Sequence, residues 1–134
     1  MKYLVSILIL SCLLCSCSEV ENQSADCMCT AVFLSIGVVV IDQNNQPVDS
    51  LSVIVMNKTS RKVYDFYGSV IDYDGRYLVM TDQYVKDFSI YPRTIVFTGK
   101  KGNAEVSADY QIITDDCQCH VGKLSGPDTL KITL

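Results

Sequence analysis

The chain has 134 residues, 49% of them hydrophobic, and its 11 basic residues are outnumbered by 15 acidic ones, for a net charge of −4. An acidic chain is a poor partner for a phosphate backbone, so we expect no nucleic-acid binding. The residues with the most distinctive chemistry are seven cysteines and one histidine. Small chains rich in cysteine are typical of oxidising compartments.

The chain begins with the layout of an export signal. Met1 and Lys2 precede an almost unbroken apolar run over residues 3–14. A run of about a dozen residues is too short to cross a ~30 Å hydrocarbon core as a helix. Glu19 and Glu21 follow soon after, which also argues against an uncleaved membrane-spanning helix.

Residues 14–17 read Leu-Cys-Ser-Cys and resemble a bacterial lipobox. The resemblance implies cleavage before Cys17, followed by acylation of its thiol and its new amino group. Cys12 also has a suitable context, but cleavage there would cut the apolar run short. The alternative is an ordinary secretory signal whose cysteines are incidental. The acidic residues after Cys17 resemble the surface-export signal of Bacteroidetes lipoproteins.

These features predict three parts: a signal peptide over residues 1–16, a lipidated tether over 17–26, and one domain over 27–134. Removal of the signal peptide leaves 118 residues, enough for a single domain with its own core. It also removes Lys2, so that ten basic residues remain against 15 acidic ones.

The domain reads as β-structure almost throughout. β-branched and aromatic residues gather in short runs that are separated by turn residues. One helical turn near residues 83–88 is the exception. A polar turn is expected over 42–47, and a hairpin turn over 99–102. The expected strands cover residues 30–41, 51–56, 62–67, 76–81, 93–98, 104–114 and 129–134. About seven such strands indicate an all-β fold, a single antiparallel β-sandwich.

Part of this pattern resembles a known family. Residues 37–42 (GVVVID) and 46–53 (QPVDSLSV), followed by Gly75-Arg76-Tyr77, resemble the opening hairpin and a later motif of carboxypeptidase regulatory-like domains. The resemblance covers about residues 36–81. It implies a transthyretin-like β-sandwich, and a domain that accompanies an enzyme or receptor without being catalytic itself.

Two Cys-x-Cys motifs frame the domain, Cys27 with Cys29 and Cys117 with Cys119. Residues two apart in an extended chain face the same side, about 6.5 Å apart at Cα, so each motif presents two thiols together. Bridging within one motif would be strained, whereas two bridges between the motifs are natural. The sequence does not choose between the two cross-paired connectivities.

The competing interpretation is a metal site or a redox-sensing thiol cluster made by the same four cysteines and His120. Zinc knuckles usually separate paired cysteines by two or more residues, and an exported domain meets oxidising conditions, so we favour disulfides. We expect no cofactor.

His120, the only histidine, has no serine or aspartate partner at a recognisable motif spacing. We therefore predict that the chain is not an enzyme. Binding stays open, because tyrosines crowd one region and an exposed tyrosine face would suit a glycan or a protein. The alternative is that these tyrosines are half-buried strand residues. They are Tyr64, Tyr67, Tyr73 and Tyr77.

Together these features predict a cell-envelope lipoprotein, anchored in the outer membrane by its acyl chains and facing the periplasm or the cell surface. Its β-sandwich would act as an accessory or binding module, with an envelope protein or a glycan as partner. The alternatives are a metal-binding or thiol-sensing lipoprotein and a glycan-binding surface lipoprotein.

Overall fold

The computed structural model describes residues 27–66 and 74–134. The signal peptide, Cys17 and the tether therefore lie outside the described residues, as do Tyr67 and Tyr73. The described part holds eight strands and one 3₁₀ helix, η1 (Asp82–Asp87). The strands are β1 (Ser35–Ile41), β2 (Ser52–Asn57), β3 (Val63–Tyr64), β4 (Arg76–Thr81), β5 (Arg93–Lys101), β6 (Ala104–Thr114), β7 (Val121–Ser125) and β8 (Thr129–Lys131).

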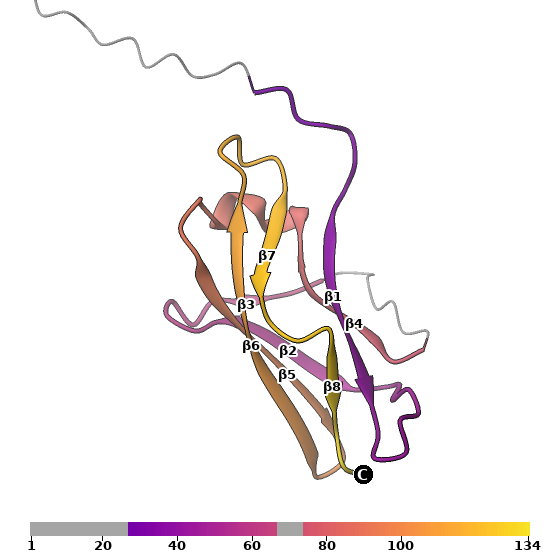
Figure 1. Cartoon of the computed structure of the whole chain (residues 1–134). Coiled ribbons are helices and arrows are strands. Elements are labelled where there is room, and N and C mark those ends of the chain that lie inside the picture. Colours follow the sequence, from indigo (N-terminus) through magenta and orange to yellow (C-terminus); the bar gives the residue numbers. More distant parts are fainter. Residues whose placement is uncertain (1–26, 67–73) are drawn as a thin grey trace, which may run out of the picture.

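The strands form two sheets, as the all-β prediction requires (Figure 1). The smaller sheet has the order β4-β1-β8, and the larger has the order β3-β2-β5-β6-β7. All neighbours pair antiparallel except β1 and β8, which run parallel from Val39 opposite Thr129 to Ile41 opposite Lys131. The expectation of a purely antiparallel sandwich is therefore corrected at this pair. The reason is that β8 follows β7 across from one sheet to the other and enters beside β1 in the same direction (Figure 1).

The hydrophobic core draws on both sheets. Val38 and Val40 of β1 are 1% and 0% exposed, and Phe97 of β5 and Tyr110 of β6 are fully buried. In β1 and β5 buried residues alternate with more exposed ones, which is the period-2 pattern of a strand with one face on a core. Each buried side chain of Phe97 size contributes roughly 1.5–3 kcal/mol to the free energy of folding.

The long hairpin of β5 and β6 is the largest paired unit, from Arg93 opposite Ile112 to Lys101 opposite Ala104. Its turn consists of Gly102 and Asn103, so β5 includes residues 99–101, which the sequence predicted as part of a turn over 99–102. Gly102 has φ +59°, as the first central residue of a type II′ turn requires. The register explains the shift, since a two-residue turn lets three more residue pairs form.

The predicted polar turn over residues 42–47 is confirmed. The Asp42 carboxylate accepts hydrogen bonds from the backbone N–H groups of Asn44 at 2.7 Å and Gln46 at 2.9 Å. Asn45 takes the left-handed conformation that such turns need, with φ 63°. These bonds, of which the one from Gln46 is the strongest influence, lower the pKa of the Asp42 carboxyl.

The first strand is shorter than predicted, because it starts at Ser35 and not at residue 30. Ser35 pairs with Thr81, the last residue of β4, and the chain then turns into η1. Residues before Ser35 have no further strand to pair with, so the apolar residues Val32 and Phe33 stay exposed. This stretch, from Cys27 to Leu34, contributes residues to the candidate functional site.

Candidate functional site

Two disulfides fasten the start of the described chain to the loop between β6 and β7. Cys27 is bonded to Cys117 and Cys29 to Cys119, with Cα–Cα distances of 5.5 and 5.3 Å. The prediction of two bridges between the motifs is confirmed. Of the two open connectivities the structure has the one in which both segments run in the same direction. Each bridge closes a loop of 90 residues.

The loop that carries Cys117 and Cys119 is itself held at several points. Asp115 accepts a hydrogen bond from the Cys119 N–H at 2.7 Å, and its backbone oxygen accepts from the Gln118 N–H at 3.0 Å. Gln118, the last residue of this turn, takes the left-handed conformation with φ 52°. Thr114, 2% exposed, donates to the His120 carbonyl at 2.9 Å. The loop thus presents both sulfurs from a fixed backbone.

Asp82, the first residue of η1, joins three segments through one carboxylate. It accepts from the N–H groups of Leu34 at 2.7 Å and Val121 at 2.8 Å, and from His120 Nδ1 at 2.7 Å. Its side chain is only 8% exposed. Burial alone would raise the pKa of the Asp82 carboxyl, but the hydrogen bonds from His120 and the two backbone groups outweigh it and hold the pKa below its ordinary value.

His120 has a partner on each ring nitrogen. Because the ionised Asp82 can only accept, His120 Nδ1 carries the donated proton, and His120 Nε2 lies 2.8 Å from the hydroxyl oxygen of Thr30. The sequence shows no serine or aspartate partner for His120 at a motif spacing, and the structure supplies its partners, Asp82 and Thr30, from distant parts of the chain. The partners lie 38 and 90 residues away, beyond any motif spacing.

The pairing of the cysteines would have given a clue to one of these partners. Once Cys29 is bonded to Cys119, the next residues on the two segments, Thr30 and His120, fall side by side. Nothing in the sequence signals Asp82 in the same way, because the fold alone brings the start of η1 to this end.

Hydroxyl, imidazole and carboxylate in a row have the order of a nucleophile with its general base. Catalysis also needs a substrate site beside the hydroxyl and donors for a developing oxyanion. In this structure Thr30 is an exposed residue of the segment 27–34, which the disulfides hold. The Asp82 carboxylate already accepts hydrogen bonds from two backbone N–H groups. We therefore interpret Thr30, His120 and Asp82 as a clamp that ties the first segment to η1 and β7.

The clamp and the bridges use the same groups that the metal hypothesis required. The sulfurs of both Cys-x-Cys motifs are in disulfides, and both nitrogens of His120 make hydrogen bonds. Within residues 27–66 and 74–134 no group of three or more His, Cys, Asp or Glu side chains is arranged to hold a metal ion.

The two described tyrosines of the proposed binding face, Tyr64 and Tyr77, are buried. Tyr64 and Tyr77 are each 4% exposed and belong to the core, so neither offers an open ring face. Tyr64 packs edge-on against Tyr84 with ring centroids 4.9 Å apart. The Tyr77 hydroxyl donates to the Val48 carbonyl at 2.7 Å and accepts from the Leu51 N–H at 3.1 Å.

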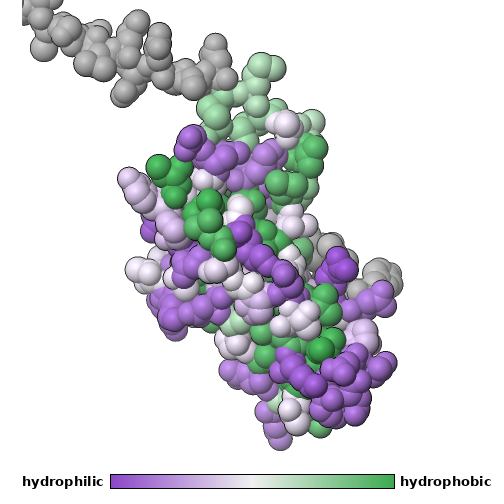
Figure 2. Space-filling view, viewed as in Figure 1, coloured by the Kyte–Doolittle hydropathy of each residue, from purple (hydrophilic) through white to green (hydrophobic). Residues whose placement is uncertain are grey.

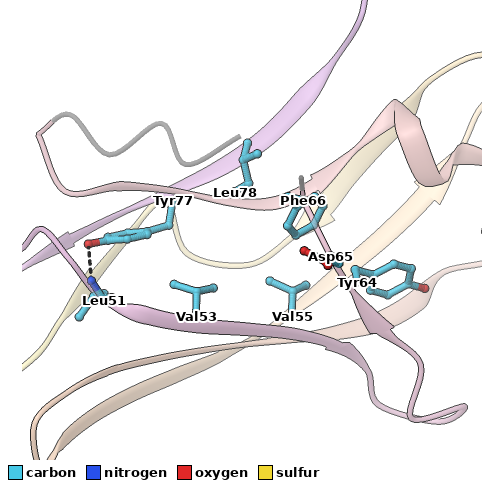
Figure 3. Close-up of a pocket in the computed structure, with 8 residues that line it drawn as sticks. All are labelled: Leu51, Val53, Val55, Tyr64, Asp65, Phe66, Tyr77 and Leu78. Carbon is cyan, nitrogen blue, oxygen red and sulfur yellow. Dashed lines mark hydrogen bonds between the residues drawn. The ribbon is translucent and has the colours of Figure 1, made fainter. Parts of the chain in front are cut away.

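A pocket of about 200 Å³ lies between β2 and β4 (Figure 3). Side chains from both sheets point into it, and most are apolar. It is smaller than the ~300–1,000 Å³ typical of sites for drug-sized molecules, so only a small apolar group would fit. Its lining consists of Leu51, Val53, Val55, Tyr64, Asp65, Phe66, Tyr77 and Leu78.

None of the helical structure in the described ranges is long and apolar enough to span a bilayer. Comparison with known proteins gives no match: no family model fits the sequence, and no curated protein or solved structure is significantly similar to the chain. The stapled and clamped end of the domain, together with the sequence that precedes it, is therefore the basis for a functional proposal.

Proposed function

We propose that this chain is a cell-envelope lipoprotein of Bacteroidetes type, acylated at Cys17, whose β-sandwich is a non-catalytic accessory or binding module. It would be anchored in the outer membrane and face the periplasm or the cell surface. One observation carries the proposal: the segment that directly follows the short tether is the segment that two disulfides fasten to the rest of the fold.

The disulfides favour an oxidising compartment outside the cytoplasm. Cys27 and Cys29 are exposed, so cytoplasmic reductants would reach them readily, whereas the periplasm and the cell surface keep such bonds oxidised. Both bridges therefore agree with export through a cleaved signal. Multiple acylation would then give stable anchoring without a spanning helix, since each buried CH₂ contributes about 0.8 kcal/mol.

The position of the bridges determines how a pull on the tether would be transmitted to the domain. A domain held by a lipid at one end feels any pull first at residues 27–34, which belong to no strand. Without a further link, the pull would pass directly to the start of β1 and separate β1 from β4 one hydrogen bond at a time. The bridges and the Asp82 clamp pass the load to β6, β7 and η1. This arrangement suits a tethered protein.

The two-sheet architecture supports a carboxypeptidase regulatory-like, transthyretin-like domain as the finer proposal. The Gly75-Arg76-Tyr77 motif has a physical role in this fold. A Cβ at position 75 would lie 2.6 Å from the Val40 carbonyl oxygen, so only glycine fits there. Two residues on, Tyr77 links β4 to the chain before β2 through its hydroxyl. In the resembled family such a domain accompanies another protein, which supports an accessory role.

Incorporation of labelled fatty acid tests the proposal. Wild-type protein and a Cys15→Ala control should incorporate label, because Leu14 makes Cys15 a poor acylation site, and Cys17→Ala should not. Undiminished labelling of Cys17→Ala would contradict the anchor.

The four cysteines gathered at one end also favour a second candidate, a thiol or zinc site in a reduced form of the protein. Thiol titration of the native protein separates the two. Four free thiols with one bound zinc would support the second candidate and contradict the two disulfides.

A further inference from the structure

Exposed apolar side chains are concentrated at the stapled end of the molecule. Ten large hydrophobic residues in the described ranges are strongly exposed, and six of them belong to residues 27–34 or to the loop between η1 and β5. Figure 2 shows hydrophobic side chains at the end where the described chain begins, with hydrophilic ones between them, and other hydrophobic groups farther along the same face. Five of the six form what we name the tether-end patch: Met28, Val32, Phe33, Ile90 and Tyr91.

The two parts of the patch are held near each other by bonds through the cysteine loop. Residues 27–29 are bonded to Cys117 and Cys119, while the Gln118 side chain donates to the Phe88 carbonyl at 3.2 Å. The Thr114 N–H donates to the Ser89 carbonyl at 3.0 Å. Ile90 and Tyr91, 52% and 74% exposed, follow directly. A fixed framework therefore carries exposed apolar groups from two segments.

The length of the tether places this end near the proposed anchor. Nine residues separate Cys17 from Cys27. Fully extended they reach about 30 Å, and as a flexible chain they span roughly 15–18 Å. The end of the domain that the tether holds closest to the acyl chains is thus the end with the apolar patch.

We propose that the tether-end patch lies on the membrane, with Phe33, Val32 and Met28 in the interfacial region of the bilayer. This proposal rests on the acyl anchor proposed above. Exposed aromatic and aliphatic side chains at one end of a fixed body are the groups that enter this region, and Tyr91 has the amphipathic ring that favours it. The exposed pair Asp115 and Asp116 lies in the adjoining loop, so apolar contact and not attraction to anionic lipid holds the patch.

A tryptophan introduced into the patch tests the contact, because the chain has none of its own. Phe33→Trp is the test variant, at a position 64% exposed, where the fold tolerates the change. Leu134→Trp is the matched control: it is 52% exposed and sits at the C-terminus, at the opposite end from Cys27 (Figure 1). The processed, acylated protein is reconstituted into phosphatidylcholine vesicles with and without brominated acyl chains.

We expect a blue shift of the Phe33→Trp emission on vesicles and a loss of intensity with brominated lipid, neither of which depends on salt. Leu134→Trp should show neither change. If the protein floats with the vesicles but Phe33→Trp behaves like the control, the docking is wrong and the anchor stands. If the protein does not float with the vesicles, the anchor fails and the docking with it. A blue shift that needs high protein concentration and is not quenched would show that a second protein covers the patch, which would also overturn the proposal.

Discussion

The hairpin of β5 and β6 and the stapled segment 27–34 are held by different forces. The hairpin is one continuous stretch of chain. It is stabilised by backbone pairing and by buried side chains such as Phe97 and Tyr110. In the stapled segment most side chains are exposed, and the links are two disulfides and the Asp82 clamp, to partners 48 to 90 residues away. Burial stabilises the body, whereas covalent and polar links fix the end that would carry the tether.

Removal of both disulfides should have the largest effect. Replacement of all four cysteines by serine should lower the free energy of unfolding by about 4–5 kcal/mol, because a 90-residue loop is no longer closed in the unfolded chain. Replacement of Cys27 and Cys117 alone should cost less than about 1 kcal/mol, since the second bridge still closes nearly the same loop. Urea denaturation of the three proteins measures both values. Equal and additive losses for the two bridges would contradict this explanation.

A pair of phenylalanine substitutions compares the two regions directly. Phe97→Ala should lower the free energy of unfolding by about 3–5 kcal/mol, because the fully buried ring leaves a cavity between the sheets. Phe33→Ala, at a 64% exposed position of the stapled segment, should change it by less than about 0.5 kcal/mol. Denaturant midpoints give both values. A large loss for Phe33→Ala would show that this segment is packed in solution.

Asp82→Asn should loosen the clamp. The amide cannot accept from all three donors, so the free energy of unfolding should fall by about 1–3 kcal/mol. Amide exchange at Leu34 and Val121 should rise, because the carboxylate that accepts from both is gone, while exchange in β5 changes little.

The pH dependence provides the control for this substitution. The folded pKa of Asp82 lies below its unfolded value, so its contribution is fully present above the unfolded pKa, about 3.9, and is lost as the pH falls through the folded pKa. The wild type should lose this contribution in acid, and Asp82→Asn should lack that part of the acid-induced loss. Identical acid profiles would contradict the role of the carboxylate.

A small effect is expected at Thr81. Among the described residues its hydroxyl oxygen is buried without a hydrogen-bond partner, so Thr81→Val should leave stability unchanged or raise it by up to about 1 kcal/mol. The equally buried Thr114 donates to the His120 carbonyl at the base of the cysteine loop. Thr114→Val should therefore cost about 1–3 kcal/mol, because that carbonyl is left unpaired. Thermal unfolding of the two variants measures the difference.

The body of the domain was largely predictable, because β-branched and aromatic residues are concentrated in β1, β2 and β4 to β6. β7 was missed. Its sequence, VGKLS, has two large apolar residues and a glycine, and it is a strand only because it pairs with β6. The bridges could be expected from the two Cys-x-Cys motifs, but their connectivity and the Asp82 contacts depend on how the sheets place distant segments together.

The most direct test of the central claim, an acylated Cys17 followed by a stapled domain, is the mass of unreduced tryptic fragments of the native protein. The sequence has no lysine or arginine between residues 17 and 57, so trypsin releases fragment 17–58, and it also releases 102–123. We predict that the two fragments stay joined, that the joined species carries acyl chains at Cys17, and that reduction separates it with a gain of two hydrogen atoms per bridge. Separate fragments with free thiols, or a fragment that still extends into residues 1–16 without lipid, would contradict the account.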